Sequence, residues 1–123
     1  MPGYLLDTNS VIYFFNGEEK ISKIIEDAED FICISFITKI ELLCFETDDT
    51  EIIKEITKFI EVVEVLFIND AIISKAIEYR KNIKLKIPDS IIVATAQVMR
   101  LTLVSADKSL IQKLKDVKVI SPI

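Results

Sequence analysis

Residues 4–17 read YLLDTNSVIYFFNG, and the fold prediction rests on this stretch. Tyr4-Leu5-Leu6 has the apolar character of a short strand, and it ends at an acid, Asp7. A helix is predicted from Thr8 to Asn16, because Asp7 or Thr8 can cap its start and Gly17 can end it. The stretch therefore indicates a strand whose carboxyl end passes directly into a helix.

The rest of the chain continues the alternation of short apolar strands with helices. Further strands are predicted at residues 31–34, 65–68, 103–104 and 117–120. Further helices are predicted at 18–28, from Ser35 to about Glu46, after 48–50, after Asn69 or Asp70, from Pro88 to about Arg100, and at 107–114. The resulting order β-α-α-β-α-α-β-α-α-β-α-β favours an α/β three-layer sandwich with a central short-stranded parallel sheet. Since 123 residues leave no room for two domains, we expect one domain over residues 1–123.

The composition is that of a globular protein with a substantial core, since 50% of the residues are hydrophobic and 28% are charged. The longest apolar run, Val11 to Phe15, is far shorter than the roughly 18 residues of a membrane-spanning helix. No basic region precedes the apolar residues at the start, and Asp7 interrupts them, which argues against a signal peptide. We therefore expect a cytoplasmic protein with no membrane partner.

Histidine is absent, which excludes His-based nucleophilic triads, zincin motifs and His-ligated metals. Two cysteines, Cys33 and Cys44, are too few for a disulfide framework, and their apolar neighbours predict buried free thiols. The net charge of −5 gives no global basic footprint for nucleic acid. Any catalysis must therefore use carboxylates, hydroxyls or amines.

Two acids are expected at the carboxyl edge of the sheet, where sites gather in parallel α/β folds. Asp7 follows the first strand directly, and Asp107 comes three residues after Val104 at the end of a later strand. Each of them could simply be a helix N-cap.

Two further acids lie beside apolar helix positions. Glu41 is placed on or beside a stripe formed by Ile37, Ile40 and Cys44, where a carboxylate is costly unless it is paired, bound to metal or able to reach solvent. Asp89 begins the apolar stripe of its own helix, although a first-turn acid also complements the helix dipole.

A convergence of these four acids on one sheet edge would create a site for a hard cation. Carboxylate oxygens suit Mg²⁺ or Mn²⁺, which also bind substrate phosphate. Without a cation the acids would repel one another, and with one they could activate water for attack on a phosphodiester.

Four motifs resemble those of the PIN-domain nucleases and, within that family, the VapC-type toxins of toxin–antitoxin pairs. They are Leu5-Leu6-Asp7-Thr8-Asn9, Ser35 to Leu42 with Glu41 as its acid, Ile87 to Ala96 with Asp89 as its acid, and Leu103-Val104-Ser105-Ala106-Asp107-Lys108. The resemblance covers essentially the whole chain. One departure is that Ser109-Leu110 stands where family members commonly have an Asp-Phe pair.

The resemblance implies a metal-dependent endoribonuclease that leaves a 5′-phosphate and a 3′-hydroxyl. Asp7, Glu41, Asp89 and Asp107 would hold Mg²⁺ or Mn²⁺. Asn9 and Ser105 would not bind the metal directly but would orient its ligands or waters. It also implies a homodimer and a small antitoxin protein that blocks the site. Positive charge for RNA could come from Lys39, Lys84, Lys86 and Lys108, which could equally be ordinary solvated lysines.

Other functions are compatible with parts of this sequence. Haloacid dehalogenase-type phosphatases need a second acid at the position of Asn9, and receiver domains need acids that are missing beside Asp7 and after the third strand. Flap nucleases that cut DNA carry extra acids and a helical clamp for which this chain is too short. A PIN fold that binds RNA or protein without cleaving it remains the alternative.

Overall fold

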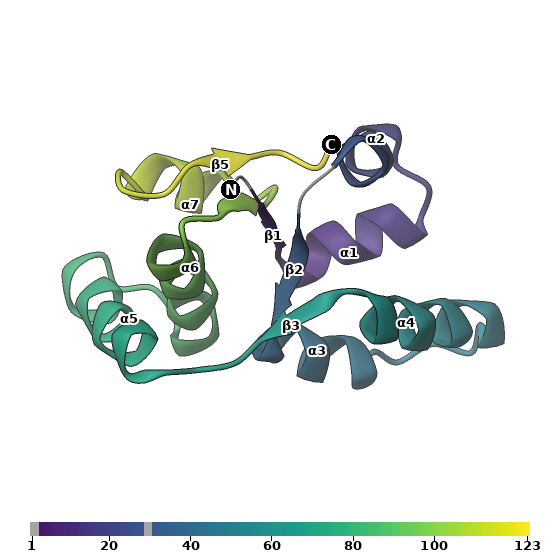
Figure 1. Cartoon of the computed structure of the whole chain (residues 1–123), viewed down its shortest axis with the longest axis horizontal. Coiled ribbons are helices and arrows are strands. Elements are labelled where there is room, and N and C mark those ends of the chain that lie inside the picture. Colours follow the sequence, from purple (N-terminus) through teal and green to yellow (C-terminus); the bar gives the residue numbers. More distant parts are fainter. Residues whose placement is uncertain (1–2, 29–30) are drawn as a thin grey trace.

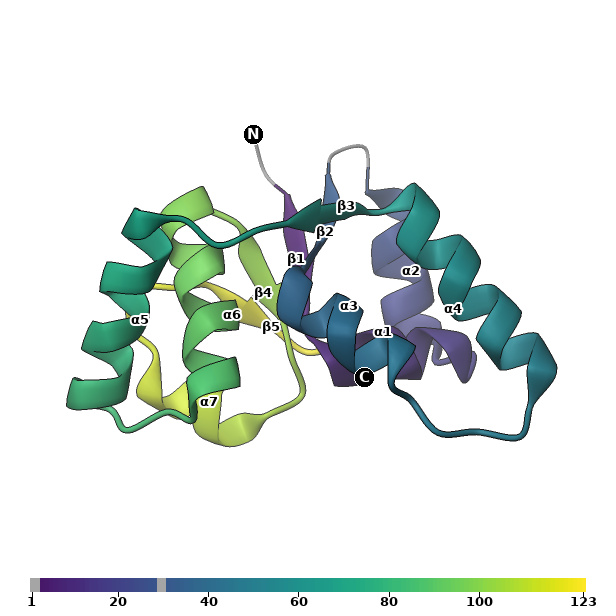
Figure 2. The same cartoon turned by 90° about the horizontal axis from the view of Figure 1, so that it is seen from below.

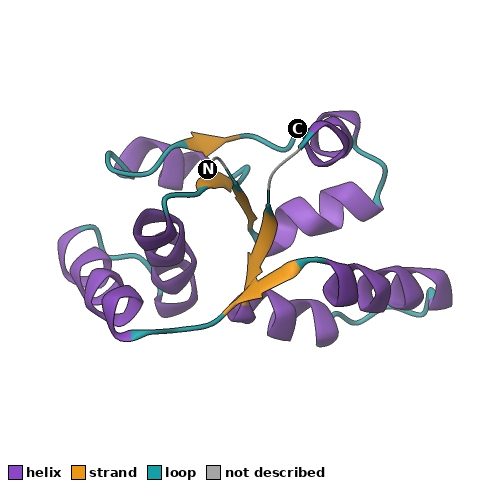
Figure 3. Ribbon diagram, in the orientation of Figure 1, coloured by secondary structure: helices purple, strands orange, loops and turns teal. Residues whose placement is uncertain are grey.

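The protein is an α/β three-layer sandwich, described here from a computed structural model that covers residues 3–28 and 31–123 (Figures 1 and 3). Its central sheet is parallel, with strand order β3-β2-β1-β4-β5. The strands are β1 (Tyr4–Leu6), β2 (Ile32–Ser35), β3 (Glu64–Leu66), β4 (Thr102–Val104) and β5 (Val119–Ile120). The helices are α1 (Thr8–Phe15), α2 (Glu19–Asp27), α3 (Phe36–Leu43), α4 (Thr50–Val62), α5 (Asp70–Asn82), α6 (Ile87–Met99) and α7 (Lys108–Lys113). The predicted order of strands and helices and the predicted fold class are confirmed.

Strand β1 occupies the centre of the sheet and pairs with β2 on one side and β4 on the other. Successive side chains of a strand point to opposite faces, so Leu5 and Leu6 enter different layers. The register aligns Leu5 with Cys33 and Leu103, and it aligns Leu6 with Ile34 and Val104. All of these side chains are buried, which explains why the central strands are apolar at these positions.

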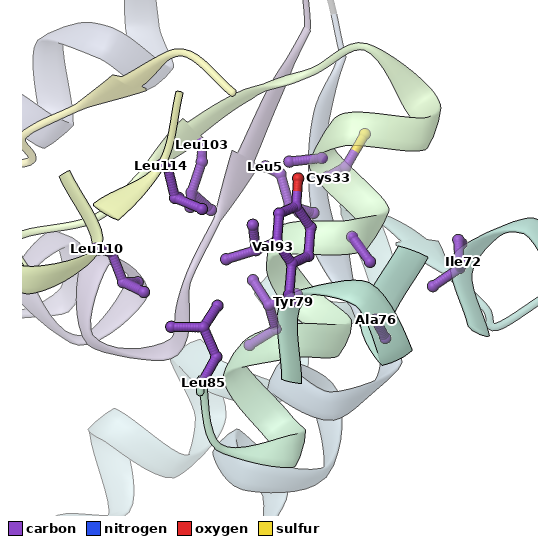
Figure 4. Packing of buried hydrophobic residues seen from close by; sticks show 13 residues of the cluster. Leu5, Cys33, Ile72, Ala76, Tyr79, Leu85, Val93, Leu103, Leu110 and Leu114 are labelled. Atoms are coloured by element: carbon purple, nitrogen blue, oxygen red, sulfur yellow. The ribbon is translucent and has the colours of Figure 1, made fainter. Parts of the chain in front are cut away.

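The two faces of the sheet carry separate hydrophobic cores. Helices α1 to α4 lie on one side of the sheet and α5 to α7 on the other (Figures 1 and 2). The core under α5 and α6 contains Tyr79, which lies among aliphatic side chains from several elements (Figure 4). Its hydroxyl donates a hydrogen bond of 2.8 Å to Asp116, and Lys75 pairs with the same carboxylate at 2.9 Å. This polar network joins α5 to the segment between α7 and β5.

Strand β3 is shorter and earlier than the predicted strand at residues 65–68. It spans Glu64–Leu66, and the two residues after it, Phe67 and Ile68, are exposed. As an edge strand it pairs only with β2, and this pairing is limited to three residues, Cys33 to Ser35 of β2. Phe67 and Ile68 are therefore apolar surface residues and are not part of the strand, although their apolar character predicts one.

Helix α3 turns a different face to the core from the one its apolar residues predict. The expected stripe of Ile37, Ile40 and Cys44 is wrong, since Ile40 is 55% exposed and Cys44 is also exposed. Thr38 and Leu42, four residues apart, are buried in its place. The apolar spacing predicts the wrong face because one of the two buried residues is a threonine. The helix also ends at Leu43, earlier than the predicted end near Glu46.

None of the helices in the described part of the chain combines the length and the apolar content that a membrane crossing requires.

The two thiols should differ sharply in reactivity. Cys33 is 4% exposed, and burial, with a smaller contribution from Glu64, raises its pKa to about 11. Because the thiolate is the nucleophile, native protein at pH 8 should react with iodoacetamide at Cys44 while Cys33 stays unmodified. Mass spectrometry of the digested protein measures this, with urea-unfolded protein as the control in which both sites react. Equal labelling of both cysteines in native protein would contradict the placement of Cys33 in the core.

Candidate functional site

Asp7 lies at the carboxyl end of the central strand, where it forms the N-cap of α1. Its Oδ1 accepts a hydrogen bond of 2.8 Å from the Ser10 backbone N–H. Its own N–H donates to the Val104 carbonyl at 3.1 Å, so pairing with β4 continues one residue past the strand. Ser10, which is fully buried, also donates its hydroxyl to Val104 at 2.8 Å. The position of Asp7 is therefore fixed from both β1 and β4.

Asp107 lies at the same edge of the sheet and forms the N-cap of α7. Its Oδ1 accepts from the Ser109 N–H at 2.9 Å and from the Ser109 hydroxyl at 2.7 Å, and these bonds hold the pKa of Asp107 below its usual value. Ser105 acts on both acids. Its fully buried hydroxyl accepts a hydrogen bond of 3.1 Å from the Asp107 N–H, and it opposes part of the rise in the pKa of Asp7 that burial causes.

Glu41 reaches the site from α3, the helix that follows β2. Its Oε1 accepts a hydrogen bond of 2.7 Å from the hydroxyl of Thr8, the first residue of α1. Glu41 is exposed, so its carboxylate reaches solvent and does not face the core. The Thr8 hydrogen bond nevertheless brings it to the helix that Asp7 caps.

Asp89 occupies the first turn of α6. Behind it the helix buries Ile92, Val93 and Ala96, as the spacing from Asp89 predicts. Pro88 stands beside it at the helix start, where its missing N–H removes no intrahelical bond. The buried stripe therefore holds α6 with its amino end at the acidic edge.

The charges of the other three acids act on Asp89. Its pKa is raised, first by burial, then by Asp107 and Glu41 and to a smaller extent by Asp7, while Lys86 opposes the shift. The pKa of Asp7 is raised as well, mainly by burial, with Asp107 contributing. Acidic side chains from four separate segments thus lie close enough for electrostatic repulsion between them.

The donor chemistry of these residues fits a hard divalent cation. Carboxylate oxygens are the preferred ligands of Mg²⁺ and Mn²⁺, and mutual repulsion is what a bound cation would relieve. Within residues 3–28 and 31–123, no three His, Cys, Asp or Glu side chains already stand in a geometry that could hold a metal ion.

The lysines predicted from the sequence come from three separate parts of the chain. Lys86 precedes α6, and its positive charge opposes the rise in the pKa of Asp89. Lys108 begins α7 directly after Asp107. Lys84 is exposed in the α5–α6 connection, with a positive φ of 57°. Lys39 is half-buried on α3. Asn9, the remaining polar residue expected at the site, is exposed on the first turn of α1.

Two threonines at this site were missed by the sequence analysis. The sequence places Thr8 in the first motif and offers it as a helix cap, but Asp7 takes the capping role and the Thr8 hydroxyl donates a hydrogen bond to Glu41. Thr38 lies 3.2 Å from Thr8, between their hydroxyl oxygens. The spacing of Thr38 and Glu41, three residues apart on one helix, is the signal that could have found the second threonine.

The chain belongs to the PIN domain family, whose model matches residues 4–116. Among solved structures, a toxin–antitoxin complex from Klebsiella pneumoniae is 27% identical with a TM-score of 0.82, covering 98% of both chains. VapBC-1 from nontypeable Haemophilus influenzae is 24% identical with a TM-score of 0.82, again covering 98% of each chain. DNA-bound VapBC from Salmonella typhimurium is 20% identical with a TM-score of 0.84 and covers 100% of both.

No curated protein is similar to this sequence at a significant level. The family match confirms the resemblance to PIN domains, and the structural neighbours share the fold.

Replacing Asp89 by asparagine should stabilise the protein at pH 7 in the presence of EDTA. The pKa of Asp89 is raised in the folded state above the ordinary 3.8, so ionisation favours the unfolded chain. The gain in the free energy of unfolding should develop as the pH rises above about 3.8 and should vanish below it. Urea unfolding at pH 3.5 and pH 7 measures the difference.

Asp70→Asn is the matched control, since Asp70 is also a first-turn acid, on α5. It should lose about 0.3–1 kcal/mol of helix-dipole stabilisation at pH 7. A loss of the same sign in Asp89→Asn would show that Asp89 is only a first-turn acid.

Proposed function

We propose that this protein is a metal-dependent endoribonuclease and the toxin of a type II toxin–antitoxin system. The observation that carries the proposal is the convergence of four acids at one edge of the sheet, where burial raises the pKa of Asp89 and the charges of Asp107, Glu41 and Asp7 add to the rise. Membership of the PIN domain family supports nuclease chemistry. Asp7, Glu41, Asp89 and Asp107 would be the ligands of Mg²⁺ or Mn²⁺.

A divalent ion held by these carboxylates would supply an activated water and would neutralise charge on the phosphodiester. The chain's own residues prepare that chemistry. Asp7 and Asp107 are held by backbone N–H groups at two helix starts, and the Ser105 hydroxyl accepts a hydrogen bond from the Asp107 N–H. Lys86 and Lys108 lie beside the acids and would contact RNA phosphates, which the acidic surface as a whole would repel.

Cleavage should require both a divalent metal and Asp89. Purified protein is incubated with structured RNA, unstructured RNA and matched single-stranded DNA, in Mn²⁺, in Mg²⁺ and in EDTA. Asp89→Asn keeps the size of the side chain and removes one ligand charge, so RNA cleavage should fall by more than about 100-fold, beyond the usual effect of supporting residues. Asp70→Asn should cut RNA as the wild type does.

RNA cleavage that persists in Asp89→Asn would contradict the site, and preferential cleavage of DNA would contradict the substrate. If nothing is cut, calorimetric titration with Mn²⁺ separates two cases. Binding that Asp89→Asn abolishes supports a nuclease of narrow specificity. Absence of binding supports the alternative function, a PIN fold that binds RNA or protein without catalysis.

A small antitoxin protein is the partner we propose for the groove between α1 and α4. The groove is lined by Phe14, Phe15, Glu55, Lys58, Phe59 and Val62. Phe15 and Phe59 meet edge to face with ring centroids 5.6 Å apart. An aromatic groove flanked by both signs of charge suits an amphipathic segment. The similarity of this chain to toxin–antitoxin complexes among solved structures supports this partner class.

A second copy of the chain is the partner we propose for the face formed by α5 and α6. Isoleucines dominate this face, whose lining residues include Ile68, Ile73, Ile77, Ile87 and Ile91. Four of them, Ile68, Ile73, Ile77 and Ile87, are between 41% and 62% exposed. An aliphatic surface of this kind can pack on itself about a two-fold axis.

Ile77→Glu should convert the homodimer to a monomer, because it places two carboxylates in the proposed interface. Multi-angle light scattering at micromolar concentration measures the mass. Ile111→Glu is the matched control, since Ile111 is 41% exposed on α7 and Ile77 is 49% exposed on α5. A wild-type monomer, or a dimer that survives Ile77→Glu, would contradict this assignment.

A further inference from the structure

Two threonine hydroxyls lie behind the Glu41 carboxylate and connect it to the interior. The Thr8 hydroxyl oxygen is 2.7 Å from Glu41 Oε1 and 3.2 Å from the hydroxyl oxygen of Thr38. Thr38 is fully buried on α3, whereas Glu41 is exposed three residues later on the same helix. The hydroxyls therefore form a continuous path from the core to an exposed side chain.

The direction of these hydrogen bonds follows from the number of hydrogens available. An ionised carboxylate can only accept, so the single hydrogen of Thr8 goes to Glu41. The hydrogen between the two threonines must then come from Thr38, which donates to Thr8. Thr38 thus orients Thr8, and Thr8 orients Glu41.

Thr38 differs in this respect from Thr57 and Thr95, two other threonines in helices. Thr57 on α4 donates its hydroxyl to the Ile53 carbonyl at 3.0 Å, and Thr95 on α6 donates to the Ile91 carbonyl at 2.8 Å. Both satisfy their hydroxyls within their own helix, which is the common local solution. Thr38 instead directs its hydroxyl across to α1.

We propose that Thr38 and Thr8 are positioning residues that hold Glu41 in one rotamer with a free oxygen directed to the acidic edge. The proposal rests on the proposed function, in which Glu41 is a metal ligand. An exposed glutamate without such a partner samples several rotamers, so each binding event would have to order it. The threonine pair orders Glu41 before the metal arrives.

The test compares Thr8→Val, which removes the hydroxyl at nearly constant volume, with Thr8→Ser, which keeps it. Metal-free NMR couplings that report the χ1 angle of Glu41 should show one rotamer in the wild type and in Thr8→Ser, and averaging in Thr8→Val. Calorimetry should show Mn²⁺ affinity about 10- to 100-fold weaker in Thr8→Val and largely restored in Thr8→Ser. Thr38→Val should act in the same direction, with Thr38→Ser as its rescue.

Thr57→Val is the matched control, because it removes a threonine hydroxyl that bonds within α4, and it should leave both readouts unchanged. Rotamer averaging of Glu41 in the wild type, or an unchanged Glu41 rotamer in Thr8→Val, would overturn the proposal. The NMR readout needs neither metal nor RNA, so it decides the positioning role even if the nuclease function fails. Loss of Mn²⁺ binding in Thr8→Val with a retained single rotamer would also overturn it.

Discussion

The pairing of β1 with β2 and β4 is the constraint on which the rest of the structure depends. β1 has only three residues, and it must pair on both edges and bury side chains on both faces. Leu5 and Leu6 supply one side chain to each core, so neither layer of helices can form without this strand. Parallel pairing of such short strands also places all their carboxyl ends at one edge, and that edge is where polar side chains can gather.

Some of the acids at this edge stabilise the fold, and one of them destabilises it. Asp7 and Asp107 are helix N-caps, which stabilise α1 and α7, and capping leaves them at the ends of β1 and β4. Structural and functional interpretations of these residues are therefore compatible. Asp89 contributes no such bond among the described hydrogen bonds, yet its burial beside other acids raises its pKa. A carboxylate that the fold tolerates at a cost is a stronger indication of function than a cap.

The sequence predicted the parts of the molecule that depend on local pattern. The order of strands and helices, the stop at Gly17 and the buried stripe behind Asp89 could be predicted because each is set by residues a few positions apart. The family match confirms the resemblance that four short motifs indicated. The prediction of a buried Cys44 was wrong, because it treated α3 as a helix whose apolar residues all face inward.

By itself, the sequence determined the fold class, through the alternation of short apolar strands with capped helices, and it singled out the four acids through their places in that alternation. Only the tertiary structure decided which face of α3 is buried and that Thr38 and Thr8 lie behind Glu41. The physical reason is that helix periodicity shows which residues share a face, but not what that face meets. Thr8 and Glu41 are 33 positions apart, and the parallel pairing of β1 with β2 is what brings their helices together.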